Sequence, residues 1–128
     1  MISNQILQST IEGLKSITRI DLCVCDTDGK MLATTLSEVE VEEDAILAFV
    51  ISPADSQVIS GYQFFKVFDE HQLEYVLLAE GASDDVYMVG KIAAFQIQNL
   101  LIAYKERFDK DNFIKNLLLD NLLLVDIY

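Results

Sequence analysis

The spacing of apolar positions changes several times along this chain, and each change marks a predicted element. Over Ile2–Ile17 the apolar residues recur every three or four positions, which predicts an amphipathic helix. Residues 19–25 alternate instead, with residues 20, 22 and 24 on one face and 21, 23 and 25 on the other, as in a strand. Residues 30–35 are a second β-prone run, and Asp26-Thr-Asp-Gly29 between the two predicts a hairpin turn in which Gly29 takes a positive φ.

The middle of the chain repeats this arrangement after a second helix. Acidic residues from 38 to 44 precede an apolar run, which suits the positive end of a helix over about 42–51. Residues 61–68 and 73–79 read as two strands, joined by a turn at Asp69-Glu-His-Gln72. Ser83 is the expected N-cap of the helix that follows.

That long helix carries two apolar stripes. The first stripe recurs at spacings of three and four and consists of Val86, Val89, Ala93, Ile97, Leu100 and Tyr104. The second stripe flanks it and consists of Met88, Ile92, Phe95 and Ile102. A helix with two apolar sides buries both of them, so we expect one side to cover a sheet and the other to meet a partner helix.

The C-terminal segment is apolar almost all the way round. Asp109-Lys-Asp predicts a brief break, and residues 113–128 then predict a Leu-rich helix without a capping residue at its end. A helix that is apolar on every side must be buried on every side. We therefore expect a connector helix from 108 to 128 that dimerises and continues into a longer chain. The expected dimer interface consists of Val89, Leu100, Tyr104, Phe113, Leu117 and Leu124.

Together these elements predict an α+β fold. Two hairpins separated by a helix make a mostly antiparallel sheet, flanked by the N-terminal helix and the long C-terminal helices. This layout is similar to that of the PAS, GAF and profilin-like group of small folds. We assign residues 1–107 to this domain.

Composition narrows the class of protein. The net charge of −12 opposes nucleic-acid binding by this segment, because phosphate contacts need clustered Lys and Arg. No apolar run reaches the roughly eighteen residues of a membrane span, and the N-terminus lacks the features of a secretory signal. We therefore expect a cytoplasmic protein without membrane contact. The apolar fraction of 52% is high, which favours self-association.

The candidate chemistry is sparse. The one histidine, His71, falls in a predicted turn, and Cys23 and Cys25 have no basic neighbour to activate a thiol. Two thiols without a further Cys or His cluster do not complete a zinc site, and Asp26-Thr-Asp-Gly29 lacks the later ligands of a calcium loop. We expect no enzyme activity, no metal and no cofactor. Redox sensing by the two thiols remains an alternative.

A small-molecule site is the remaining candidate. Tyr62, Phe64 and Lys66 share one strand face, Tyr75 lies on the next strand, and Cys23 is near in the predicted sheet. Such a set lines a ligand cavity in some modules of this layout, with Lys66 as an anion contact. The alternative is that these aromatic residues are core beneath a helix.

Two segments carry a resemblance to a known family. Residues 104–128 resemble the linker of bacterial transcription regulators of purine catabolism and sugar-diacid utilisation (PucR/CdaR type), and Asp28-Gly-Lys-Met-Leu-Ala-Thr34 resembles a hairpin common in sensor modules. The resemblance implies an N-terminal sensory domain that regulates transcription as a homodimer. The chain itself lacks a helix-turn-helix. The alternative is a protein-interaction scaffold of the roadblock type, in which a solid core replaces a ligand pocket.

Overall fold

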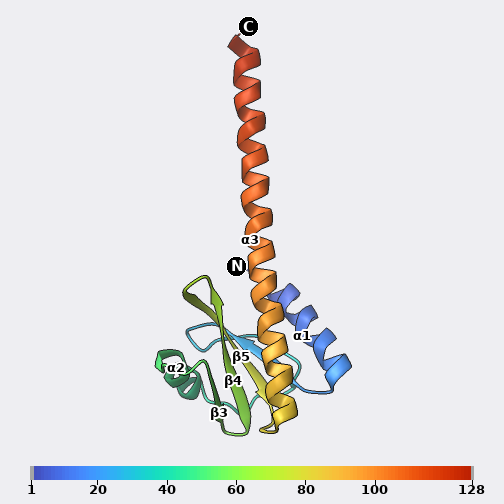
Figure 1. The fold of residues 1–128 in the computed structure, drawn as a ribbon, viewed down its shortest axis with the longest axis vertical. Helices are drawn as coiled ribbons and strands as arrows, with labels where there is room; N and C mark the ends of the chain where they lie inside the picture. The colour runs from blue at the N-terminus through green and yellow to red at the C-terminus, as the bar shows by residue number, and fades with distance from the viewer. Residues whose placement is uncertain (1, 128) are drawn as a thin grey trace.

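The computed structural model describes the backbone of residues 2–127 and the side chains of residues 2–106. Its elements, in chain order, are α1 (Asn4–Thr18), β1 (Leu22–Cys25), β2 (Met31–Thr34), α2 (Glu43–Ile51), β3 (Ser56–Ile59), β4 (Tyr62–Asp69), β5 (Gln72–Glu80) and α3 (Asp84–Ile127). The strands form a five-stranded antiparallel sheet in the order β2-β1-β5-β4-β3. The expected α+β class, with an antiparallel sheet flanked by the terminal helices, is confirmed (Figure 1).

The helices cover both faces of the sheet. α1 and α3 lie on one face, and α2 lies on the other (Figure 1). The alternation in β1 serves both layers: Leu22 and Val24 belong to the core under α1 and α3, whereas Cys23 and Cys25 belong to the core under α2. A strand buried on both faces reads as a continuous apolar run, as this one does.

Local signals explain where several elements begin and turn. The side chain of Ser3 caps α1 by accepting a hydrogen bond from the Ile6 N–H. In the β1–β2 turn, Gly29 has the expected positive φ of 85°. The Asp26 carboxylate closes this turn by accepting hydrogen bonds from the N–H groups of Asp28 and Lys30, both at 2.9 Å. Ser83 precedes α3 as expected, and its hydroxyl accepts from the Val86 N–H at 3.4 Å.

One strand was not predicted. β3 pairs with β4 through a two-residue turn at Ser60 and Gly61, which have φ values of 53° and 82°. Two successive positive φ values are typical of the tight turns that join antiparallel strands. The Ser-Gly pair between Ile59 and Tyr62 was therefore a hairpin signal in the sequence.

The predicted break at Asp109-Lys-Asp is wrong. α3 is a single helix of 44 residues from Asp84 to Ile127, so the boundary expected at residues 107 and 108 falls within it. Asp and Lys carry only modest helix penalties, and neither Gly nor Pro occurs nearby to interrupt the backbone hydrogen bonds. The helix runs past the sheet and extends well beyond the other elements (Figure 1).

α3 packs tightly against the sheet at Gly90. This glycine is buried, and a Cβ atom built there would overlap the ring of Phe65 on β4. Ala93 and Ile97 continue the contact along the helix, both with no exposed surface. Gly90 thus lets α3 lie directly against an aromatic ring of the sheet.

Candidate interaction surface

The five residues predicted to bind a small molecule do not line one cavity. Cys23, Tyr62 and Phe64 are buried in the core beneath α2, with exposed fractions of 1%, 6% and 0%. Tyr75 is opposite Val67 in the register of β4 and β5 and lies on the other face of the sheet, in the core under α1 and α3. The four buried side chains, of Cys23, Tyr62, Phe64 and Tyr75, are therefore packed in the core.

Lys66 and Tyr75 both use their polar atoms within the chain. The Lys66 ammonium donates to the backbone carbonyl of Ser52 and lies 5.1 Å from the centroid of the Phe49 ring. The Tyr75 hydroxyl accepts from the Ile2 N–H at 3.2 Å. Among the described residues, no buried side-chain nitrogen or oxygen lacks a hydrogen-bond partner. Both polar groups thus have at least one partner within the chain.

The two thiols are held in their neutral form. Burial raises the pKa of the Cys23 thiol, and burial raises the pKa of Cys25 to about 12. Cys23 Sγ contacts the Thr34 hydroxyl at 3.2 Å, and Cys25 Sγ contacts the Met31 sulfur at 3.8 Å. Because the thiolate is the reactive species, both cysteines are poor nucleophiles at neutral pH.

No metal site is apparent in residues 2–106, where no group of three or more His, Cys, Asp or Glu side chains is placed to hold an ion. His71 is exposed and lies in the turn between β4 and β5, where the sequence predicted it.

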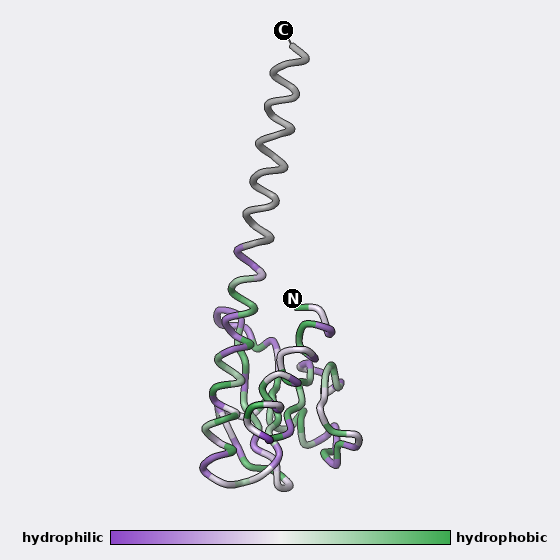
Figure 2. Tube along the Cα trace, turned by 90° about the vertical axis from the view of Figure 1, so that its right-hand side faces the viewer, coloured by the Kyte–Doolittle hydropathy of each residue, from purple (hydrophilic) through white to green (hydrophobic). Residues whose placement is uncertain are grey.

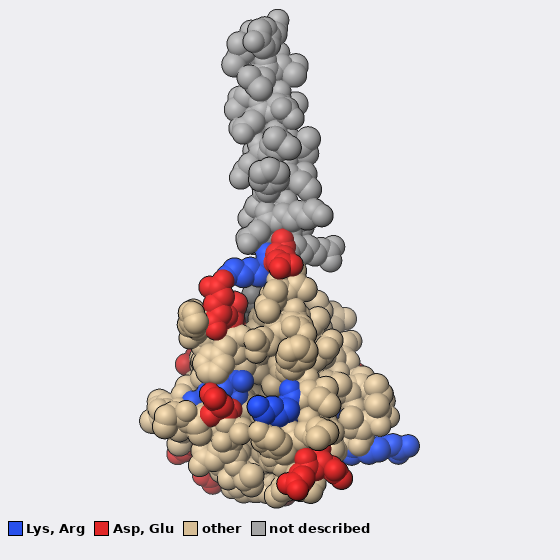
Figure 3. All heavy atoms as spheres, in the orientation of Figure 1, with Lys and Arg blue, Asp and Glu red and all other residues tan. Residues whose placement is uncertain are grey.

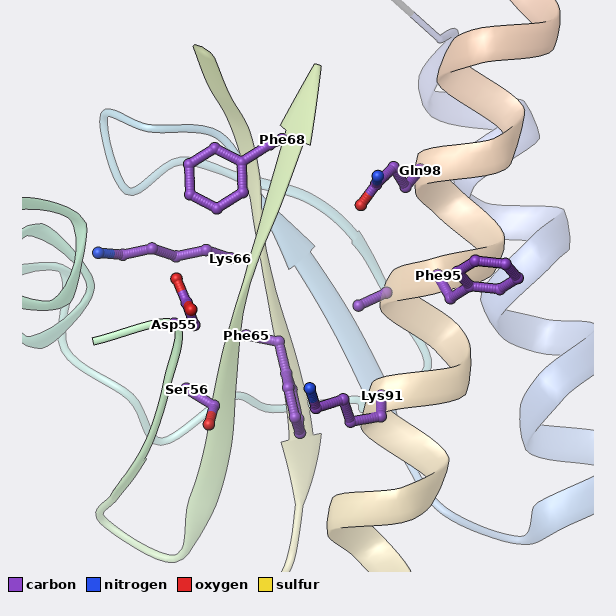
Figure 4. A pocket seen from close by; sticks show the side chains of 9 residues that line it. Asp55, Ser56, Phe65, Lys66, Phe68, Lys91, Phe95 and Gln98 are labelled. Atoms are coloured by element: carbon purple, nitrogen blue, oxygen red, sulfur yellow. The ribbon is translucent and has the colours of Figure 1, made fainter. Parts of the chain in front are cut away.

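An open depression of about 310 Å³ lies between β4 and α3 (Figure 4). Its lining residues include Phe65, Lys66, Lys91 and Gln98. The two lysines diverge: Lys91 points toward Phe65, while Lys66 points away from α3 toward α2 (Figure 4). The cations do not converge on a common point, so this depression does not form an anion site.

The most distinctive surface is the outer side of α3. We call Met88, Ile92, Phe95, Asn99 and Ile102 the outer stripe. Its four apolar members are exposed, with Met88 and Phe95 each at 65%, Ile92 at 53% and Ile102 at 45%. Asn99 is exposed as well. The second stripe predicted from the sequence is therefore on the surface of the chain, although Phe95 also lines the depression between β4 and α3.

The outer stripe lies opposite the side that packs on the sheet. We call Val86, Gly90, Ala93, Ile97 and Leu101 the inner face, and all five are buried. Successive residues of a helix are rotated by about 100°. With this rotation, the five residues of each group point within about 40° of one common direction around the helix axis. The directions of the inner face and of the outer stripe differ by half a turn. The outer side of a surface helix is usually polar, whereas the outer side of α3 carries an apolar stripe.

The surroundings leave the outer stripe accessible. α3 lies at one side of the domain in the view of Figure 2, with α1 beside it (Figure 1). Figure 3 views the molecule from the side on which α3 lies, and much of the surface there is uncharged. Glu106 follows the stripe and is exposed, which ends the run of uncharged positions.

The residues predicted for a dimer interface fall in three different surroundings. Val89 and Leu100 are half-buried, and Leu100 packs against the core under α1 and α3. Tyr104 is 45% exposed and lines an apolar hollow of about 170 Å³ with Ile2 and Ile6 of the N-terminal segment. The side chains of Phe113, Leu117 and Leu124 lie outside the described residues.

Asn99 was missed by the sequence reasoning. It separates Phe95 from Ile102 and lies at the same helical spacing as the apolar members of the stripe. A search of the sequence for the same helical spacing, with polar residues included, would have identified Asn99.

One segment of the described chain has the length and apolar composition of a membrane span. It is Asp84–Glu106 of α3, with a mean hydropathy of 1.3. A core helix of a soluble domain passes the same test, and α3 packs on the sheet through its inner face. The segment is weak evidence for a membrane.

Comparisons with known proteins do not add an identity. No protein-family model matches this sequence, and no curated protein matches it significantly.

Proposed function

We propose that this chain is a non-catalytic regulatory domain that forms a homodimer through α3. The observation that carries the proposal is the outer stripe, an exposed apolar row on the helix side that faces away from the core. Burying Phe95 and its neighbours against a second copy would remove their apolar surface from water. A two-fold pair places the same surface of each chain against its copy, and an uncharged stripe meets that requirement without like-charge contacts.

The continuous α3 gives the dimer a regulatory role. Its inner face packs on β4 and β5, and the same helix extends beyond the domain. A change in the packing of the sheet would therefore bias the arrangement of the paired helices. The resemblance to bacterial transcription regulators extends this proposal to a cytoplasmic sensory domain that controls a DNA-binding partner domain.

The lack of catalysis is part of the proposal and is supported by the chemistry of the site. The thiols of Cys23 and Cys25 are buried with raised pKa values, and His71 lies in an exposed turn away from both. Neither thiol is therefore paired with the histidine.

A scaffold of the roadblock type is the second candidate. It is favoured by the solid packing under α2, where Phe49 and Phe64 meet edge to face with centroids 5.5 Å apart. A thermal-shift screen with small metabolites separates the two candidates. A saturable rise in Tm favours the sensory domain, and a flat response favours the scaffold.

The dimer is tested by sedimentation equilibrium on wild type, Phe95→Glu and a matched control, Ile51→Glu. Ile51 lies on α2 and is 87% exposed, so both changes place a charge at an exposed apolar position. We expect Phe95→Glu to raise the dimer Kd by at least roughly a hundredfold, because its carboxylate would be buried in the interface. Ile51→Glu should leave the Kd unchanged.

Three outcomes contradict the proposal. A wild-type monomer at high concentration excludes the dimer, and loss of the dimer only in Ile51→Glu moves the interface to α2. A monomer that sediments with phosphatidylcholine vesicles, and loses this binding in Phe95→Glu, assigns the outer stripe to a membrane instead.

A further inference from the structure

Given the homodimer proposed above, on which the following rests, we infer that the two α3 helices run parallel, with Asn99 of one copy facing Asn99 of the other. The outer stripe is spaced by four, three, four and three residues from Met88 to Ile102. This is the spacing of core positions in a two-stranded coiled coil, in which each core residue of a parallel pair faces its own copy.

Asn99 distinguishes the two orientations. In a parallel pair its amide group meets an identical amide, and each supplies both a donor and an acceptor. In an antiparallel pair the same core spacing places Asn99 opposite Met88 or Phe95, depending on the register. A buried amide opposite an apolar side chain is left without a hydrogen-bond partner, which is costly.

The charges at the two ends of the outer stripe fall differently in the two orientations. In an antiparallel pair Asp85 meets Ile102 in one register and Glu106 meets Met88 in the other, so that a carboxylate lies against an apolar side chain, twice by symmetry. In a parallel pair the four apolar positions meet only their own copies, while Asp85 and Glu106 face their own copies beyond the ends of the stripe, where both residues are exposed.

The length of α3 supports the parallel orientation as well. The outer stripe covers only the part of the helix that lies along the sheet, whereas the backbone helix continues from Glu106 to Ile127. Stable dimers bury about 1,200–2,000 Å² in total, so an interface that continues along the helix beyond the stripe favours a stable pair. Parallel helices stay side by side beyond the domain, while antiparallel helices diverge from it in opposite directions.

Disulfide trapping tests the orientation. The probes are Ile92→Cys and Ile102→Cys, each alone and mixed, together with Ile92→Cys mixed with Phe95→Cys, under mild oxidation. The native thiols give little background, because Cys23 and Cys25 are 1% and 0% exposed and have raised pKa values. The wild-type protein is the control, and after the same oxidation it should run as a single monomer band on a non-reducing gel.

We expect each single variant to form a cross-linked dimer, since a parallel pair places each position next to its own copy. The mixtures should give mostly the same homodimers. Asn99→Val, added to the cysteine variants, should leave the dimer at least as tight. The preference for the parallel pairing should be lost, so that mixed disulfides appear. A gain in mixed disulfides is a change that a purely structural role for Asn99 would not produce.

Failure of this inference is distinguishable from failure of the homodimer. A dimer in which the mixed disulfides dominate has antiparallel helices, which overturns the inference and leaves the proposed function intact. A dimer that forms no disulfide at any of these positions uses another surface and overturns both. A monomer by sedimentation removes the basis for either.

Discussion

The inner face and the outer stripe of α3 are made of similar side chains in different surroundings. Ile97 on the inner face is fully buried against the sheet, while Ile92 on the outer stripe is 53% exposed. Both belong to apolar rows with helical spacing, so hydropathy does not distinguish them. The inner face stabilises the fold of one chain, and we propose that the outer stripe stabilises the association of two. Exposure within the chain is the property that separates the two roles.

The largest expected effect is on folding and comes from the inner face. Ile97→Ala should lower the free energy of unfolding by about 2–5 kcal/mol, since it leaves a cavity against the sheet. Ile92→Ala should change the stability of the monomer by less than about 0.5 kcal/mol and weaken dimerisation instead. Urea denaturation at two protein concentrations measures both. Equal losses of monomer stability from the two changes would remove the distinction between the faces.

A smaller effect is expected where the inner face is most tightly packed. Gly90→Ala should lower the free energy of unfolding by about 1–3 kcal/mol, because the added methyl group overlaps the Phe65 ring. Gly13→Ala in α1 is the matched control, since an added Cβ meets nothing within 4 Å there. The control should gain about 0.5–1 kcal/mol from the better helix propensity of Ala. A stabilising Gly90→Ala in thermal unfolding would show that the contact is loose.

The smallest effect concerns charge at the start of β1, on the side of the domain that α1 covers. Asp21 Oδ1 lies 2.7 Å from the Lys15 ammonium and accepts from the Thr35 hydroxyl at 2.8 Å. Burial raises the pKa of Asp21, but the hydrogen bonds from Lys15 and Thr35, the charge of Lys15 and a hydrogen bond with Glu80 together hold the pKa below its ordinary value of 3.8. Because the folded pKa is the lower one, the stabilisation is present above pH 3.8 and is lost as the pH falls through the folded pKa.

Asp21→Asn should therefore lower the free energy of unfolding at pH 7 by about 0.5 kcal/mol, a small value because Lys15 is partly exposed and screened by solvent. The difference from wild type should shrink as the pH falls below about 4. Asp28→Asn, at an exposed Asp of the β1–β2 turn, controls for the loss of charge alone. A difference that persists at pH 2 in urea titrations would contradict this assignment.

Much of the fold follows from local signals. The alternation over residues 19–25 predicted a strand, and Gly29 and Ser83 predicted a turn and a helix start that the structure contains. β3 was missed because its four residues show little apolar alternation and only the Ser60-Gly61 turn identifies it. The break near residue 109 was wrong because charged residues interrupt an apolar pattern without interrupting a helical backbone.

The candidate sites were harder to predict, since they depend on register. Tyr75 lies on the sheet face opposite Phe64 because it is paired with Val67, and no single strand reveals that pairing. The outer stripe was predicted as a second apolar side of the long helix. Val89 and Leu100, predicted for the interface, are half-buried, because the orientation of a helix on its sheet is set by tertiary packing.

The contact between Gly90 and Phe65 has a mechanical consequence. α3 lies directly against the Phe65 ring there, and its backbone continues without a break to Ile127. At about 1.5 Å per residue, the far end lies roughly 55 Å from this contact. A tilt of roughly 3° about Gly90 would therefore displace that end by roughly 3 Å. If α3 is rigid and pivots at Gly90, small movements of the sheet produce larger displacements at the far end of the helix.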